Sequence, residues 1–165
     1  MQVRYYLMLL FTATFFYACN QSGNSAQLQL RIDSLEKEID ASYKPGLGEF
    51  MSQIQVHHAK LWFAGKSENW KLADFEIHEI MESLDDIQQY AAARLESKKV
   101  IMLQPALDSV NYAIEQKNTA LFTSSFELLT ATCNRCHAAV EYDFNKVKIP
   151  EIPPLSNQVF TPSEN

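Results

Sequence analysis

The chain has 165 residues, of which 47% are hydrophobic and 12% aromatic, with 4 Gly and 6 Pro. This composition excludes disorder throughout the chain and favours one packed domain over two. The 14 Lys and Arg against 20 Asp and Glu give a net charge of −6, which argues against nucleic-acid binding. Three cysteines are too few for a disulfide scaffold of this size.

Residues 1–18 have the pattern of an export signal. Arg4 is the only charged residue before Arg31, and an apolar and aromatic run follows it as far as Ala18. A positive start, an apolar stretch and a small residue before a polar segment are typical of a secretory signal. The run is too short for a transmembrane helix.

Cys19 directly follows the small residue Ala18, which resembles the lipobox of bacterial lipoproteins, although Phe16 stands where Leu is usual. The resemblance implies cleavage after residue 18 and a lipid on Cys19. The protein is then expected in the periplasm, anchored to a bacterial membrane through that lipid. An ordinary cleaved signal that contains a Cys, or an uncleaved anchor, are the alternatives.

Residues 19–46 form a polar leader and a short helix with a heptad-like apolar stripe. The apolar residues recur at spacings of 4, 3 and 4, at Leu28, Ile32, Leu35 and Ile39. Two heptads are marginal alone, so this helix is a stalk, a self-association element through residues 28–39, or a helix docked on the main body. The run Lys44-Pro45-Gly46-Leu47-Gly48 breaks the helix and marks a domain boundary.

Residues 47–145 contain four amphipathic stretches, which predict helices over about 49–64, 70–97, 105–116 and 119–140. Asn69 and Asn118 are suited to cap the second and fourth helices, and Pro105 is suited to the first turn of the third. We therefore expect an all-α fold, an antiparallel four-helix bundle. A solvated acidic face is expected on the second helix, at Glu76, Glu79, Glu82, Asp85 and Asp86.

Residues 146–165 change character, because the run Ile149-Pro150-Glu151-Ile152-Pro153-Pro154 is unsuited to a helix or a central strand. Its apolar side chains predict an extended strap that lies over the bundle. The last residues, 161–165, are expected to be loose.

The segment Cys133-Asn134-Arg135-Cys136-His137 has the attachment pattern of a c-type haem. In that pattern two thiols add across the two vinyl groups of haem and the adjacent imidazole binds the iron. On a helix, positions 133, 136 and 137 share one side, so His137 is the expected proximal ligand of one covalently attached haem c. A strained disulfide, a thiol-disulfide oxidoreductase site, or a zinc site completed by His57, His58 or His78 are the alternatives.

The ligand on the other face of the iron determines the function that the haem supports. A second protein ligand suits electron transfer, whereas an open face suits binding of a small gas. His58 is the leading candidate, because it lies on the stripe with Ile54 and Leu61, and Met51 is the alternative. His57, His78, Met81 and the absence of any protein ligand stay open.

Two further residues are candidate haem contacts. Trp62, together with Phe63 and Trp70, is expected to line the haem pocket or to seal one end of the bundle. Lys60 is a candidate partner for a haem propionate. No Gly-rich phosphate loop and no Ser/His/Asp arrangement occurs in the sequence, so we expect no enzyme activity.

A bundle whose last helix carries the haem motif resembles the cytochrome c′ (class II cytochrome c) architecture. Residues 58–65, Asn69-Trp70, the haem motif and residues 154–158 are similar to a family of small exported bacterial c-type haem proteins. The resemblance covers about residues 50 to 160. It implies a monohaem cytochrome that transfers single electrons to redox partner proteins. The alternatives are a five-coordinate module that binds NO or CO, and a non-catalytic haem subunit of a larger redox complex.

Overall fold

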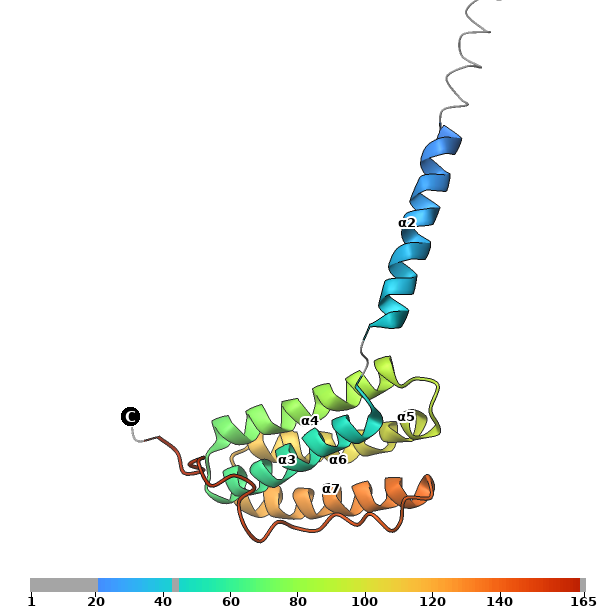
Figure 1. Cartoon of the computed structure of the whole chain (residues 1–165). Coiled ribbons are helices and arrows are strands. Elements are labelled where there is room, and N and C mark those ends of the chain that lie inside the picture. Colours follow the sequence, from blue (N-terminus) through green and yellow to red (C-terminus); the bar gives the residue numbers. More distant parts are fainter. Residues whose placement is uncertain (1–20, 43–44, 164–165) are drawn as a thin grey trace, which may run out of the picture. The chain divides into compact units, whose positions relative to one another are not determined.

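The computed structural model describes residues 21–42 and 45–163. The predicted signal at 1–18 and the predicted lipid site Cys19 lie outside the described residues. Every regular element within those two ranges is helical and none is a strand, which confirms the predicted all-α class. The chain divides into two compact units, one ending at Lys44 and the other beginning at Pro45 (Figure 1).

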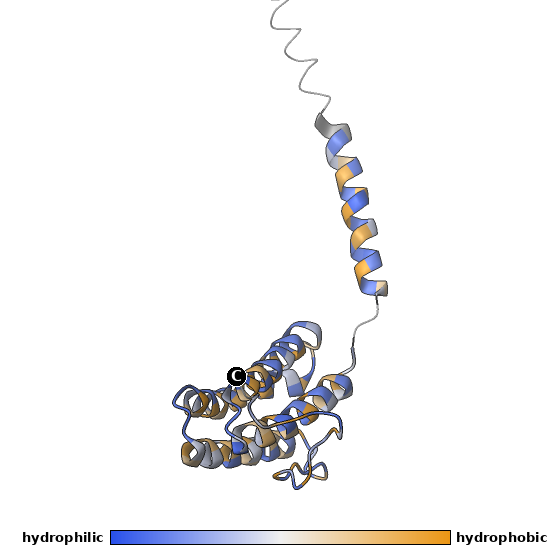
Figure 2. Cartoon of the chain, turned by 90° about the vertical axis from the view of Figure 1, so that its left-hand side faces the viewer, coloured by the Kyte–Doolittle hydropathy of each residue, from blue (hydrophilic) through white to orange (hydrophobic). Residues whose placement is uncertain are grey.

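The first unit contains helix α2 (Gln21–Ala41). All of its described side chains are exposed, including the four apolar residues of the heptad-like stripe, which are 46% to 62% exposed. Apolar and polar positions alternate around this helix in Figure 2. Among the described residues, no helix is both long and apolar enough to cross a membrane.

The second unit is built from four long helices and a short helical connection. The long helices are α3 (Leu47–Lys66), α4 (Trp70–Tyr90), α6 (Gln104–Glu115) and α7 (Thr119–Ala139), and the connection is α5 (Leu95–Lys99) with the 3₁₀ helix η2 (Val100–Leu103). Helix α3 packs on α4 and α7, and α6 packs on the same two helices (Figure 1). Each long helix therefore shares the core with two others.

The helix starts follow the predicted capping chemistry. The side-chain oxygen of Asn69 accepts a hydrogen bond from the Leu72 backbone N–H, and that of Asn118 accepts one from Leu121. Pro105 lies in the first turn of α6, where its missing N–H leaves no helical hydrogen bond unmade. These three residues define where α4, α7 and α6 begin.

Aromatic side chains fill the end of the second unit where α3 joins α4 and α6 joins α7. The Phe122 ring lies 5.9 Å from Phe126, 6.4 Å from Trp62 and 6.1 Å from Trp70, measured between ring centroids. Phe160, from the C-terminal segment, packs on Phe63 at 5.7 Å. This cluster closes that end of the core.

The C-terminal segment, residues 140–163, contains no helix or strand. It contacts the helices at several places, two of which lie far apart in the sequence. Val147 is hydrogen-bonded through its backbone to the Asn134 side chain of α7, and Phe160 is buried in the aromatic cluster. These contacts hold the segment against the helices at Val147 and at Phe160.

The predicted end of the second helix was wrong. Helix α4 stops at Tyr90 and does not continue to about Ser97. The Ser97 hydroxyl donates to the Ala91 carbonyl at 2.6 Å, which satisfies a backbone acceptor just beyond the last turn. The break lets η2 bury Val100 and Leu103 in the core. Tertiary burial outweighs the helix propensity of the alanine run at 91–93.

The prediction that Glu76 belongs to a solvated face of α4 was wrong, because Glu76 is fully buried. Its Oε2 lies 2.6 Å from His57 Nδ1, and its Oε1 lies 3.3 Å from Lys60 Nζ. A buried carboxylate needs such partners, because desolvation of an unpaired charge is costly. The apolar Phe75 takes an exposed position instead, with 52% of its surface accessible.

Gly65 of α3 packs directly on the aromatic cluster, so we expect Gly65→Ala to destabilise the protein. A Cβ at this position would overlap the ring of Phe122, whereas a Cβ at Gly48 would meet nothing within 4 Å. Gly65→Ala should lower the free energy of unfolding by about 1–3 kcal/mol, as overpacking does. Gly48→Ala, the matched control, should leave it unchanged or raise it by up to about 1 kcal/mol. Urea unfolding measures both, and equal effects would contradict this packing.

Candidate functional site

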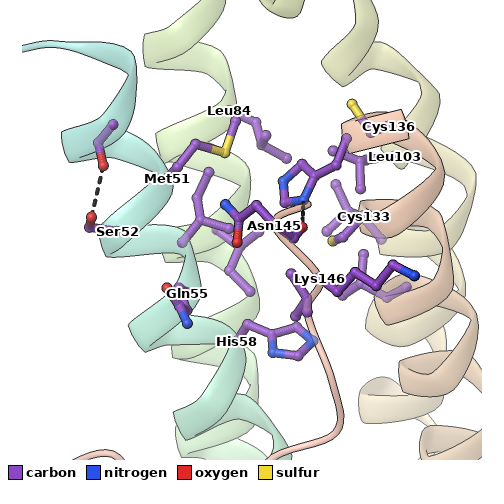
Figure 3. Close-up of a pocket in the computed structure, with 17 residues that line it drawn as sticks. Met51, Ser52, Gln55, His58, Leu84, Leu103, Cys133, Cys136, Asn145 and Lys146 are labelled. Atoms are coloured by element: carbon purple, nitrogen blue, oxygen red, sulfur yellow. Dashed lines mark hydrogen bonds between the residues drawn. The ribbon is translucent and has the colours of Figure 1, made fainter. Parts of the chain in front are cut away.

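A cavity of about 200 Å³ opens between α3 and α7, at the end of the second unit away from the aromatic cluster. Helix α3 contributes Met51 and His58 to its wall, and α7 contributes Cys133 and Cys136 (Figure 3). His137 of α7 also lines the cavity. Aliphatic side chains complete much of the wall, at Ile54, Ile80, Leu84, Leu103, Leu107 and Leu129. The structure thus brings the predicted attachment motif and both leading candidates for the distal ligand to one apolar space.

The two cysteines of the motif lie on one turn of α7 and are not joined by a disulfide. Cys136 is buried, and Cys133 is half-buried. Burial raises the pKa of the Cys133 thiol to about 12 and also raises the pKa of Cys136. Thiol-disulfide oxidoreductases use a thiol whose pKa is lowered, so the raised pKa values of both thiols do not favour this alternative.

The ring of His137 is oriented by the backbone of the C-terminal segment. Its Nδ1 lies 2.6 Å from the carbonyl oxygen of Asn145, and because a carbonyl only accepts, Nδ1 carries the proton. The Nε2 atom of His137 is then left with a free lone pair. Histidines that bind metals are commonly held in this way, by a hydrogen bond from the other ring nitrogen.

Asn134, inside the motif, fixes the segment that holds His137. Its side-chain Nδ2 donates to the Val147 carbonyl and its Oδ1 accepts from the Val147 backbone N–H, both at 2.8 Å. These two bonds hold Val147 against α7. The preceding residues Asn145 and Lys146 line the cavity (Figure 3). One residue of the motif therefore positions the hydrogen-bond partner of another.

His58 is buried on α3, with its ring centroid 4.4 Å from that of Phe126. Its Nε2 lies 2.9 Å from the Thr130 hydroxyl, which itself donates to the Phe126 carbonyl. The hydroxyl has only one proton, so His58 Nε2 donates and Nδ1 keeps a lone pair. Burial lowers the pKa of His58 to about 4, which keeps the ring neutral at physiological pH.

Lys60 and Trp62 do not line this cavity. Lys60 is paired with the buried Glu76, and the Trp62 ring lies 4.9 Å from that of Phe126 within the aromatic cluster. Of the two roles considered for Trp62, this position fits the sealing of one end of the core. Among the other histidines, His57 also binds Glu76, while His78 is exposed and bonds the Asp74 carbonyl.

A second hollow of about 490 Å³ adjoins the cavity. The two hollows share Gln55, His58, Lys146 and Val147 as lining residues. The first cavity alone is smaller than the 300–1,000 Å³ typical of pockets for drug-sized ligands, so a macrocycle would need room from both. Lys146, which sequence reasoning did not single out, lines both hollows, and Lys148 lines the second.

The donor groups at the cavity suit a haem iron. Among the described residues, no group of three or more His, Cys, Asp or Glu side chains is arranged to hold a metal ion. A haem iron takes only one or two ligands from the protein, since the porphyrin supplies the others. His137 with His58 or Met51 meets this smaller requirement, next to two thiols that are suitably spaced for attachment.

Comparison with known proteins gives no match: no protein-family model, no curated protein and no solved structure matches this chain. The resemblance to cytochrome c′ therefore stays a prediction. It depends on the residues of the motif and on their arrangement around the cavity.

Asn134→Ala should free residues 145–147 from α7, because Val147 loses both hydrogen bonds to the side chain. Each such bond contributes about 0.5–1.5 kcal/mol, and 1.36 kcal/mol corresponds to a factor of ten. Hydrogen exchange at the Val147 amide should therefore speed up by about 10- to 100-fold. Lys148→Ala is the control, because it removes only an exposed pair with Glu151. An unchanged exchange rate in Asn134→Ala would show that the two hydrogen bonds from the Asn134 side chain do not hold Val147 in place.

Proposed function

We propose that this protein is an exported monohaem c-type cytochrome that transfers single electrons. One observation carries the proposal: the Cys-x-x-Cys-His turn of α7 faces the same apolar cavity as His58 of α3. Neither His58 Nδ1 nor His137 Nε2 has a hydrogen-bond partner among the described residues. An enclosed, mostly apolar space with a few convergent polar groups is the usual setting of a cofactor site.

Cys133 and Cys136 would hold the haem covalently. Each sulfur bonds to one carbon of a vinyl group while its proton goes to the other carbon, so the addition needs no oxidant. His137, oriented by Asn145, would bind through Nε2, and Lys146, which lines the cavity, would be the candidate partner for a carboxylate of the group. When bound, haem c would supply an iron that gains and loses one electron.

His58 is our proposed distal ligand, with Met51 as the alternative on the same helix. Both line the cavity from α3, the helix that packs on the motif-bearing α7. His58 is neutral, as a metal ligand must be, and its Nδ1 has no hydrogen-bond partner among the described residues. Binding through Nδ1 would leave its bond to Thr130 intact.

We also propose the finer architecture that this function implies. Helices α3, α4, α6 and α7 would form an antiparallel four-helix bundle of the cytochrome c′ type. The Pro-rich C-terminal segment would be an extended strap that covers one edge of the haem. The support for this is the pairwise packing of the four helices and the two contacts of the segment at Val147 and Phe160.

The sequence supports a location in the periplasm. Residues 1–18 would be removed during export, and a lipid on Cys19 would tether the protein to a bacterial membrane. Covalent attachment of haem through this motif occurs in exported proteins, so the two sequence signals agree. In this role the protein carries electrons between redox partner proteins and is not an enzyme.

Binding of NO or CO is the second candidate function, and the Thr130 hydrogen bond is the observation that favours it. That bond and the contact with Phe126 hold His58 as a packed core residue. If His58 stays in this position when haem is present, the iron has an open face. Such a face suits gas binding.

Replacing the thiols tests the attachment. Mature protein made with a haem-ligation system should keep haem after denaturation and acid extraction, whereas the Cys133→Ala, Cys136→Ala variant should lose it completely. A haem stain of a denaturing gel measures this. His78→Ala is the control, since it changes an exposed histidine outside the motif and should leave the stain unchanged. Retained haem in the double variant would refute the attachment.

The state of His58 separates electron transfer from gas binding. If His58 binds the iron, the wild-type spectrum should be low-spin in both oxidation states, and CO should bind slowly or poorly. His58→Ala should then become high-spin and bind CO at least about tenfold faster, with the haem still attached. His78→Ala, which changes an exposed histidine, should behave as wild type. A wild-type protein that is high-spin and binds CO at once would make gas binding the leading function.

A further inference from the structure

We propose that α2 pairs with the α2 helix of a second copy of this chain, as a parallel two-stranded coiled coil. Within the described part of its own unit, the helix carries an exposed apolar stripe at Leu28, Ile32, Leu35 and Ile39. An exposed apolar row with heptad spacing is the typical surface of a coiled-coil partner. This inference does not rest on the proposed haem.

The residue types along the stripe select the number of strands. Spacings of 4, 3 and 4 place Ile32 and Ile39 at the a positions of the heptad, and Leu28 and Leu35 at the d positions. The β-branched Ile at a, combined with Leu at d, favours two parallel strands over three or four. The expected partner of the stripe is therefore an identical α2 helix that runs in the same direction.

The charges beside the stripe agree with this arrangement. In the same register Arg31 occupies a g position and Glu36 the following e position. In a parallel dimer these positions face each other across the interface, so Arg31 meets Glu36 of the second copy, twice by symmetry. Within one helix they are five residues apart, which is not the spacing of neighbours on a helix surface.

The stripe is short, and this bears on where the dimer forms. Two heptads give a marginal association in free solution. Two copies held on one membrane surface have a much higher effective concentration, as linked binding partners do. A lipid on Cys19 would also bring both helix N-termini to that surface, which a parallel pair requires.

Cysteine cross-linking in the full chain tests the pairing. The same register places Ser25 at an a position and Ser42 at a d position, so Ser25→Cys and Ser42→Cys report on the interface without removing an apolar residue. Ser34→Cys is the matched control, because position c lies on the outer side. After mild oxidation of membranes that contain one variant at a time, a denaturing gel shows how much protein has doubled in mass.

We expect Ser25→Cys and Ser42→Cys each to give at least about ten times more doubled product than Ser34→Cys or the unsubstituted chain. An antiparallel pair would oppose residue 25 to residue 42 and would cross-link only when the two variants are mixed. That result would overturn the parallel arrangement. Equal product from all variants, or a product whose mass reveals a different protein, would overturn pairing with a second copy.

The charge pair provides an independent check on the register. In the Ser42→Cys chain, Glu36→Arg should lower the doubled product several-fold, because the introduced guanidinium would then face Arg31 of the second copy. Adding Arg31→Glu should restore the product, since the charges are then exchanged. Leu35→Asp should abolish it. A product that is insensitive to these changes would overturn the proposed interface, whether or not the protein carries haem.

Discussion

The geometry of one turn of α7 is the constraint on which the site depends. An α-helix carries residues three and four apart on the same side, so Cys133, Cys136 and His137 point towards one region of space. That region is useful only if the neighbouring helix leaves room there. Helix α3 does so, because its half nearer Leu47 faces this turn across an apolar cavity. The motif and the packing of α3 on α7 therefore act together.

The two ends of the second unit differ in how closely they are packed. At one end, aromatic rings pack so closely that Gly65 has no room for a side chain. At the other end, the same pair of helices encloses the cavity. Between them, the buried Glu76 is paired with His57 and Lys60 and so fixes α4 against α3. A firmly packed end allows the other end to keep an open space without loss of the fold.

The local features of the fold could be predicted from the sequence, because they depend on neighbours in the chain. Helical periodicity, the caps at Asn69 and Asn118 and the position of Pro105 are of this kind. The burial of Glu76 and the end of α4 at Tyr90 could not, because tertiary packing decides both. In the sequence, Glu76 is one of five acidic residues that together indicate a solvated face. Only the folded structure shows that His57 and Lys60 pair with it.

The candidate site divides in the same way. The Cys-x-x-Cys-His spacing predicts three residues of the candidate site. Helical periodicity predicts that His58 and Met51 lie on the facing helix. The contributions of Asn134, Asn145 and Lys146 depend on how the C-terminal segment returns to α7, which no local pattern encodes. Lys60 was a reasonable candidate for a haem carboxylate, but in the structure its charge is already paired with Glu76.

Covalent haem at residues 133–137 is the central claim, and peptide mapping tests it most directly. Mature protein from cells that ligate haem should be denatured, digested with protease and analysed by mass spectrometry. We predict that the peptide containing Cys133 and Cys136 carries the mass of one haem, bonded through both sulfurs. The same peptide with two free thiols, or with a disulfide between them, would contradict the account.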